Sequence, residues 1–137
     1  STQVKHEGGM VFVGQSASGH PVRMDASSQV GGSDTAARPV EVLLSSLGGC
    51  TGMDVISLLR KMKTPPQAFS IEIQDERAAE YPKAITKLHL IYRIVGDVPE
   101  ENLVKAIDLS LSKYCPIANS LNGVAEITYS FEIAAGQ

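Results

Sequence analysis

The chain has 137 residues, of which 43% are hydrophobic and 20% charged, and its formal net charge is -3. This length and composition allow one hydrophobic core without a metal or a disulfide framework, so we predict a single domain over residues 1–137. The negative charge and the short basic runs argue against a nucleic-acid-binding protein, which needs a basic face to neutralise phosphates.

We find no run of the roughly 18 apolar residues that a membrane span requires, and residues 1–9 lack the apolar core of a signal peptide. We therefore expect no membrane partner and a cytoplasmic location. Stable disulfides are rare in the cytoplasm, and those that form there tend to be catalytic or redox-sensing. We therefore consider the cysteines of this chain as candidates for a redox reaction more than for a permanent cross-link.

The N-terminal part of the sequence predicts a small set of strands. Residues 10–15 and 20–25 are two predicted strands, joined by a small polar turn at 16–19, and a further strand is possible around residues 3–8. Residues 26–37 are rich in Ser, Gly, Ala and Asp, a composition typical of a loop.

A long apolar helix is predicted next. Pro39 stands in its first turn, where the missing N–H costs nothing, and Pro65-Pro66 ends it. Gly48-Gly49 interrupts the apolar pattern, so we expect a kink or break there, with Cys50 at the start of the second part. The glycines allow close approach of another element or expose the Cys50 sulfur. Because the helix is apolar on most sides, we expect a central helix that other elements bury.

The remaining pattern indicates a hairpin, two helices and a final strand. Apolar and polar residues alternate in two adjacent segments, which favours an antiparallel pair of strands. The predicted elements are strands at 69–73 and 87–94, a helix from Val98-Pro99, a short helix from Cys115-Pro116 to Asn122-Gly123, and a strand at 127–133. The fold class is therefore α+β, in the order β-β(-β)-α-β-β-α-α-β with a long central helix.

The two cysteines, Cys50 and Cys115, both stand where a helix is predicted to begin. The positive end of a helix dipole favours thiolate over thiol, which suggests a reacting cysteine and a partner that resolves its oxidation product. The dipole alone would lower a cysteine pKa from about 8.5 to about 7 at best. Full activation requires a further donor, for which Arg23 and Arg38 are candidates.

Other interpretations of these residues stay open. Thr51 and Asp54 fit a capping box, and the Asp54 carboxylate would either oppose a thiolate or anchor an activating arginine. Each cysteine alone is equally typical of a small buried hydrophobe. His6, His20 and His89 are scattered and there is no C-x-x-C, so we predict no metal and no cofactor, with His89 on the polar side of its strand.

Three segments together resemble the OsmC/Ohr family. They are the run ARPVEVLLSSLGGCTGMDV from Ala37 to Val55, the Lys-Tyr-Cys-Pro at 113–116, and SGHPVRMD at 18–25. With the order of elements, the resemblance covers nearly the whole chain and is greatest to the less-characterised OsmC-like branch. It implies an OsmC-like fold that forms an intertwined homodimer, with each long helix buried against its mate and the active sites at the interface.

The resemblance also implies a function in oxidative-stress defence. The thiolate of Cys50 would attack an organic hydroperoxide and become a sulfenic acid, and Cys115 would condense with it to a disulfide. An external dithiol would then reduce the protein. The implied partners are therefore a small organic hydroperoxide, a dithiol reductant and a second copy of the chain.

The activating pair of the family departs from its usual pattern here. Family peroxidases carry Glu directly after the helix-starting Pro, paired with an Arg. In this chain Val40 occupies that position and the acid follows at Glu41, about 100° further around a helix. The predicted site is thus Cys50 and Cys115, with Glu41, Arg23 and Arg38 as candidates for the pair.

Two alternatives to a peroxidase remain. One is an OsmC-like binding or regulatory domain whose interface pocket holds a small apolar ligand, which Val40 in place of the acid favours. The other is a secreted domain stabilised by a permanent disulfide between Cys50 and Cys115.

Overall fold

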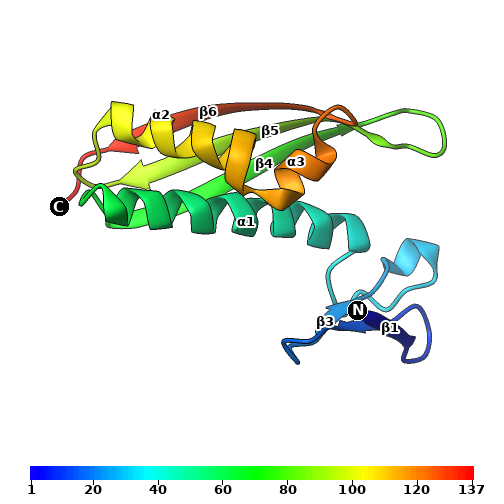
Figure 1. Ribbon diagram of the computed structural model, residues 1–137. Coiled ribbons are helices and arrows are strands. Elements are labelled where there is room, and N and C mark those ends of the chain that lie inside the picture. Colours follow the sequence, from blue (N-terminus) through cyan, green and yellow to red (C-terminus); the bar gives the residue numbers. More distant parts are fainter. The chain divides into compact units, whose positions relative to one another are not determined.

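The computed structural model describes Ser1–Gln137, in two compact units, Ser1–Ser45 and Ser46–Gln137. The predicted order of elements and the α+β class are confirmed (Figure 1). The elements are β1 (Gln3–His6), β2 (Phe12–Gln15), β3 (Val22–Met24), η1 (Ser28–Val30), α1 (Pro39–Lys61), β4 (Ala68–Arg77), β5 (Ile85–Val95), α2 (Glu100–Leu109), η2 (Ser110–Tyr114), α3 (Pro116–Leu121) and β6 (Glu126–Ala134).

The first unit holds a three-stranded antiparallel sheet in the order β1-β2-β3. The strand that was only possible around residues 3–8 is present as β1. At the β2–β3 turn the Gly19 N–H donates to the Ser16 carbonyl at 3.0 Å, with a φ of 81° at Gly19 that favours glycine. The predicted turn at 16–19 is thus confirmed.

The loop after β3 is organised by one carboxylate. Asp25 is 2% exposed, and it accepts hydrogen bonds from the backbone N–H groups of Ala26 and Thr35 and from the Thr35 hydroxyl. These donors hold the pKa of Asp25 well below its ordinary value, the Thr35 hydroxyl most of all. The predicted loop therefore has a defined anchor, and it contains the short 3-10 turn η1.

Helix α1 runs from Pro39 to Lys61 without interruption, so the predicted break at Gly48-Gly49 is wrong. Glycine costs about 1 kcal/mol in a helix interior, which packing readily outweighs. A Cβ added to Gly48 would lie 3.0 Å from Ile73 Cδ1, and one on Gly52 would lie 3.4 Å from Ile71 Cδ1. The glycine at 48 therefore serves close approach between α1 and β4, which was the alternative expectation.

The second unit contains a mixed sheet in the order β4-β5-β6. The predicted hairpin is confirmed, because β4 and β5 pair antiparallel with Phe69 opposite Ile94 and Ile73 opposite Leu90. Strand β6 pairs with β5 in parallel. A parallel pair needs a crossover connection, and α2, η2 and α3 supply it.

Both long helices cover the same face of this sheet (Figure 1). On β5, alternate side chains face them and are buried, while the residues between face away. His89 is on that second, polar face, where its ring bonds to Thr128 and Ser130, as its alternation predicts. Arg93 bridges Glu72 and Glu132 on the same face. The buried residues of β5 are Leu88, Leu90, Tyr92 and Ile94.

Helix α1 buries a single stripe, which differs from the expectation of a helix buried on most sides. The stripe repeats every four residues and consists of Leu47, Thr51, Val55 and Leu59. By length and composition alone the helix is apolar enough to cross a membrane, although the sequence showed no run of roughly 18 apolar residues. A core helix has the same composition. Met53, on an open face, is 76% exposed.

Candidate functional site

The structure brings the two cysteines together within the second unit. Cys50 lies on α1 and is half-buried, whereas Cys115 lies between η2 and α3 and is fully buried. The Cys50 side chain is near enough to contribute to the raised pKa of Cys115, and neither cysteine is part of a disulfide. Residues 65 positions apart (115 − 50) thus form one dithiol site.

Cys115 caps a helix, as predicted. It is the residue before α3, Pro116 follows it in the first turn, and its Sγ accepts a hydrogen bond from the Ala118 N–H at 3.3 Å. The pKa of Cys115 is nevertheless raised to about 11, chiefly by burial and to a smaller extent by Cys50, against the lowering by the Ala118 N–H. Loss of water around the sulfur therefore outweighs the helix end, and Cys115 is held as a thiol.

Cys50 does not stand at a helix start, which corrects the sequence prediction. Helix α1 begins at Pro39, eleven positions earlier (50 − 39), and the helix dipole acts mainly within the first turn. The thiol of Cys50 therefore gains nothing from the N-terminus of its own helix. Its distinguishing features are its partial exposure and its nearness to Cys115.

A π-helical turn, which we did not predict, directly precedes Cys115 and positions it in the site. Segment η2 follows α2 directly, and the Cys115 N–H donates to the Ser110 carbonyl at 2.8 Å, a bond between residues five apart. π turns are rare and are found frequently at functional sites. The sequence Ser-Leu-Ser-Lys-Tyr carries no signal that separates such a turn from the α-helix before it.

Four polar side chains form a buried hydrogen-bond chain beside the cysteines. The Thr51 hydroxyl lies 2.9 Å from the Tyr92 hydroxyl and 2.7 Å from the Ser110 hydroxyl, which donates to Asp54 at 2.9 Å. Thr51, Tyr92 and Ser110 are completely buried. The predicted capping box of Thr51 and Asp54 is wrong, because both residues lie inside α1, where the backbone N–H groups already have partners.

The phenols of Tyr92 and Tyr129 are held in their protonated form. Burial raises the pKa of Tyr92, and negative charge at Cys115 would raise it further. Tyr129, whose hydroxyl donates to Asp108 at 2.8 Å, has its pKa raised to about 12, chiefly by burial. Tyr92 is thus a hydrogen-bond donor beside the dithiol site.

The three other predicted site residues belong to the first unit. The Arg23 guanidinium pairs with Glu7 at 3.4 Å. Arg38 pairs with Asp34 at 2.6 Å, and this bond is the main reason that its pKa is raised. Glu41 accepts a hydrogen bond from the Arg38 backbone N–H at 2.9 Å, which satisfies a free donor at the start of α1. Arg38 and Glu41 are therefore neighbours.

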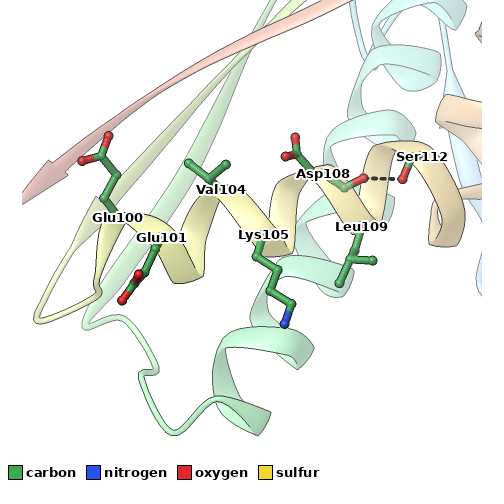
Figure 2. A pocket seen from close by; sticks show the side chains of 7 residues that line it. All are labelled: Glu100, Glu101, Val104, Lys105, Asp108, Leu109 and Ser112. Carbon is green, nitrogen blue, oxygen red and sulfur yellow. Dashed lines mark hydrogen bonds between the residues drawn. The ribbon is translucent and has the colours of Figure 1, made fainter.

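A cavity of about 680 Å³ lies along α2, and neither cysteine lines it. Figure 2 shows its lining side chains, all from α2 and η2, with the Ser112 hydroxyl bonded to the Asp108 carbonyl. The lining residues are Glu100, Glu101, Val104, Lys105, Asp108, Leu109 and Ser112. Because one continuous stretch lines it, this cavity is an open surface hollow and not an enclosed active site.

Comparisons with known proteins place the fold. Residues 31–130 match the family described as OsmC-like protein. Protein YhfA of Escherichia coli K12 is 36% identical over 134 residues, which cover 97% of both chains. The structure of a hypothetical protein from Aquifex aeolicus has a TM-score of 0.87 at 24% identity and covers 100% of this chain and 97% of its own.

A more distant solved structure carries a functional description. It is an organic hydroperoxide resistance protein OsmC from Legionella pneumophila, with a TM-score of 0.68 at 17% identity over 96% of each chain. At that identity the likeness concerns the fold alone. From the family match and the relative in E. coli, the chain belongs to the OsmC/Ohr family of OsmC-like proteins.

Proposed function

We propose that this protein is a thiol peroxidase that reduces organic hydroperoxides in oxidative-stress defence, in the cytoplasm. The Cys50 thiolate attacks the terminal peroxide oxygen, the O–O bond breaks, and the alcohol leaves after taking a proton, so that Cys50 becomes a sulfenic acid. The Cys115 sulfur then attacks the Cys50 sulfur and releases water, and a disulfide results. A dithiol reductant returns both residues to thiols.

The nearness of the two thiols, one half-buried and one buried, is the observation that carries this proposal. Their exposure supports these roles, because Cys50 is half-buried and a substrate can reach it, whereas Cys115 is buried and can react only with a neighbouring residue. The Cys50 side chain contributes to the raised pKa of Cys115, as a neighbouring group that can become an anion would. A Cys50 thiolate would accept a hydrogen bond from the Cys115 thiol, and a charge-assisted bond is about twice as strong as a neutral one.

The activating groups are part of the same proposal. Arg38 and Glu41, which lie next to one another, are the better candidates for the family's Arg–Glu pair, and Arg23 is the alternative. Arg38→Met should slow the alkylation of the Cys50 thiol, and Arg23→Met should leave the rate of alkylation unchanged. The reverse result would assign the role to Arg23.

A homodimer belongs to the proposal as well. Met53 on the open face of α1 is 76% exposed, and most of the apolar stretch of that helix is uncovered in a single chain. A second copy would cover this face, as the family resemblance implies. Sedimentation equilibrium of the wild-type protein tests this assembly.

The central experiment follows thiols and products together. Wild-type protein should lose both thiols with cumene hydroperoxide and form one disulfide within each chain. Cys50→Ser should abolish consumption of the hydroperoxide, while Cys115→Ser should stop at a sulfenic acid that dimedone traps. Hydrogen peroxide is the comparison substrate, against which the organic hydroperoxide should react faster. Thiols that persist in excess cumene hydroperoxide would refute a peroxidase.

A binding or regulatory domain is the second candidate. Two features favour it, because both predict thiols of low reactivity. They are Val40 in place of the family's acid and the raised pKa of Cys115. Native mass spectrometry of the purified protein distinguishes the two. A retained small apolar ligand, together with thiols that hydroperoxide does not oxidise, would support this candidate.

A further inference from the structure

The buried hydroxyl chain has a fixed direction. A serine or threonine hydroxyl has one proton to donate. The Ser110 proton goes to the Asp54 carboxylate, so Ser110 must accept from Thr51. The Thr51 proton is then committed, and Thr51 must accept from Tyr92. The protons therefore all point the same way, from Tyr92 through Thr51 and Ser110 to Asp54.

Ser110 connects the two cysteine-bearing segments. Its hydroxyl contacts Thr51 and Asp54, both on α1, and Thr51 directly follows Cys50. Its carbonyl accepts the Cys115 N–H at 2.8 Å, the bond that closes the π turn. One residue thus holds helix α1 with its side chain and the Cys115 backbone with its main chain.

We infer that Ser110 and Thr51 are positioning residues that hold the Cys115 sulfur against the Cys50 sulfur for disulfide closure. This inference rests on the proposed dithiol function. The three hydroxyls are completely buried, and every buried side-chain polar atom of the protein has a partner, so no water has to enter to satisfy them. Removal of one hydroxyl frees η2 from α1, and the sulfur carried at the end of η2 loses its fixed position.

Two pairs of variants test the inference. Thr51→Val keeps the size of the side chain and removes its hydroxyl, and Thr51→Ser restores the hydroxyl. Ser110→Ala removes the central hydroxyl, and Ser112→Ala is its control on the same π turn, since the Ser112 hydroxyl is exposed and bonds only to Asp108. Thermal unfolding first establishes that each variant is folded, and Thr51→Val serves if Ser110→Ala does not fold.

The measurement separates the two steps of the reaction. With cumene hydroperoxide, the loss of the first thiol should proceed at the wild-type rate in all variants. Disulfide closure should slow at least about tenfold in Thr51→Val and Ser110→Ala, because small misplacement of reacting atoms costs one to two orders of magnitude in rate. Dimedone should then trap Cys50 sulfenic acid in those two variants, but not in Thr51→Ser or Ser112→Ala. A loss of stability alone would not shift this partition in folded protein.

Diamide keeps the inference testable apart from the peroxidase. This diazene takes up the two thiol protons and electrons, becomes a hydrazine, and leaves the disulfide. If the wild-type thiols do not react with cumene hydroperoxide but form the disulfide with diamide, the proposed function fails. The rate of disulfide formation can then still be compared among the variants. If Thr51→Val closes as fast as wild type with diamide, the positioning role is refuted.

Discussion

The contact between Gly48 and Ile73 makes a quantitative prediction about stability. Replacing an interior helical glycine by alanine stabilises a helix by about 1 kcal/mol. At position 48 the new Cβ would meet Ile73 Cδ1 at 3.0 Å, and a forced departure of Ile73 from its rotamer costs about 0.5–1.5 kcal/mol. The two effects nearly cancel, so Gly48→Ala alone should change the free energy of unfolding by less than about 0.5 kcal/mol.

Ile73→Val removes the Cδ1 atom that obstructs the new Cβ, so the stabilisation of the helix by alanine at position 48 becomes measurable. The next atom of Ile73, Cγ1, would be 4.0 Å from the new Cβ, an ordinary contact. In the Ile73→Val background, Gly48→Ala should therefore stabilise by about 1 kcal/mol. For 137 residues this corresponds to a rise in Tm of about 3–4 °C. Urea unfolding of all four proteins gives the coupling energy directly.

Gly49 is the control for this cycle. A Cβ there meets nothing within 4 Å, so Gly49→Ala and Ile73→Val should be additive. If Gly48→Ala has the same effect in both backgrounds, close approach to Ile73 is not the reason for glycine at position 48.

Three further predictions concern charge and assembly. Because the pKa of Cys115 is raised in the folded protein, the unfolded chain loses the thiol proton at a lower pH, and the free energy of unfolding should fall as the pH rises from about 9 to about 11. Cys115→Ala should show a smaller fall when urea unfolding is repeated at alkaline pH. An equal fall would show that Cys115 is not its source. Because Asp25 has a lowered pKa, its contribution to stability is present above about pH 4 and is lost on acidification. Asp25→Asn should therefore reduce the fall in stability at acid pH. An unchanged fall would exclude Asp25 as its source. Met53→Glu should weaken a dimer that uses the open face of α1, as measured by sedimentation equilibrium, whereas unchanged association would place the interface elsewhere.

Local signals predicted the elements of this fold well. Pro39 predicted the first turn of α1, and Cys115-Pro116 predicted the start of α3. The alternation of apolar and polar residues predicted β5, with His89 on its polar face. Each of these signals acts within one turn or one strand, so neighbours in the sequence suffice to read it. The helix end at Cys115 is the part of the site that this reasoning found.

The features that sequence reasoning missed depend on residues far away in the chain. Gly48 indicates a helix break by propensity, and only the approach of Ile73 explains its presence inside α1. Thr51 and Asp54 have the spacing of a capping box, but their partner is Ser110, nearly sixty positions away. The direction of the Cys115 pKa shift was wrong for the same reason, because burial depends on the packed unit and not on the helix end.

The pairing of two sulfurs 65 positions apart links oxidation to folding (115 − 50). A cross-link over such a loop removes chain entropy from the unfolded state equivalent to about 4 kcal/mol. By linkage, the folded protein favours its own oxidation by the same amount, which lowers the reduction potential by about 90 mV relative to the unfolded chain. The oxidised protein would thus be the more heat-resistant form, and a strongly reducing dithiol would be needed to reset it.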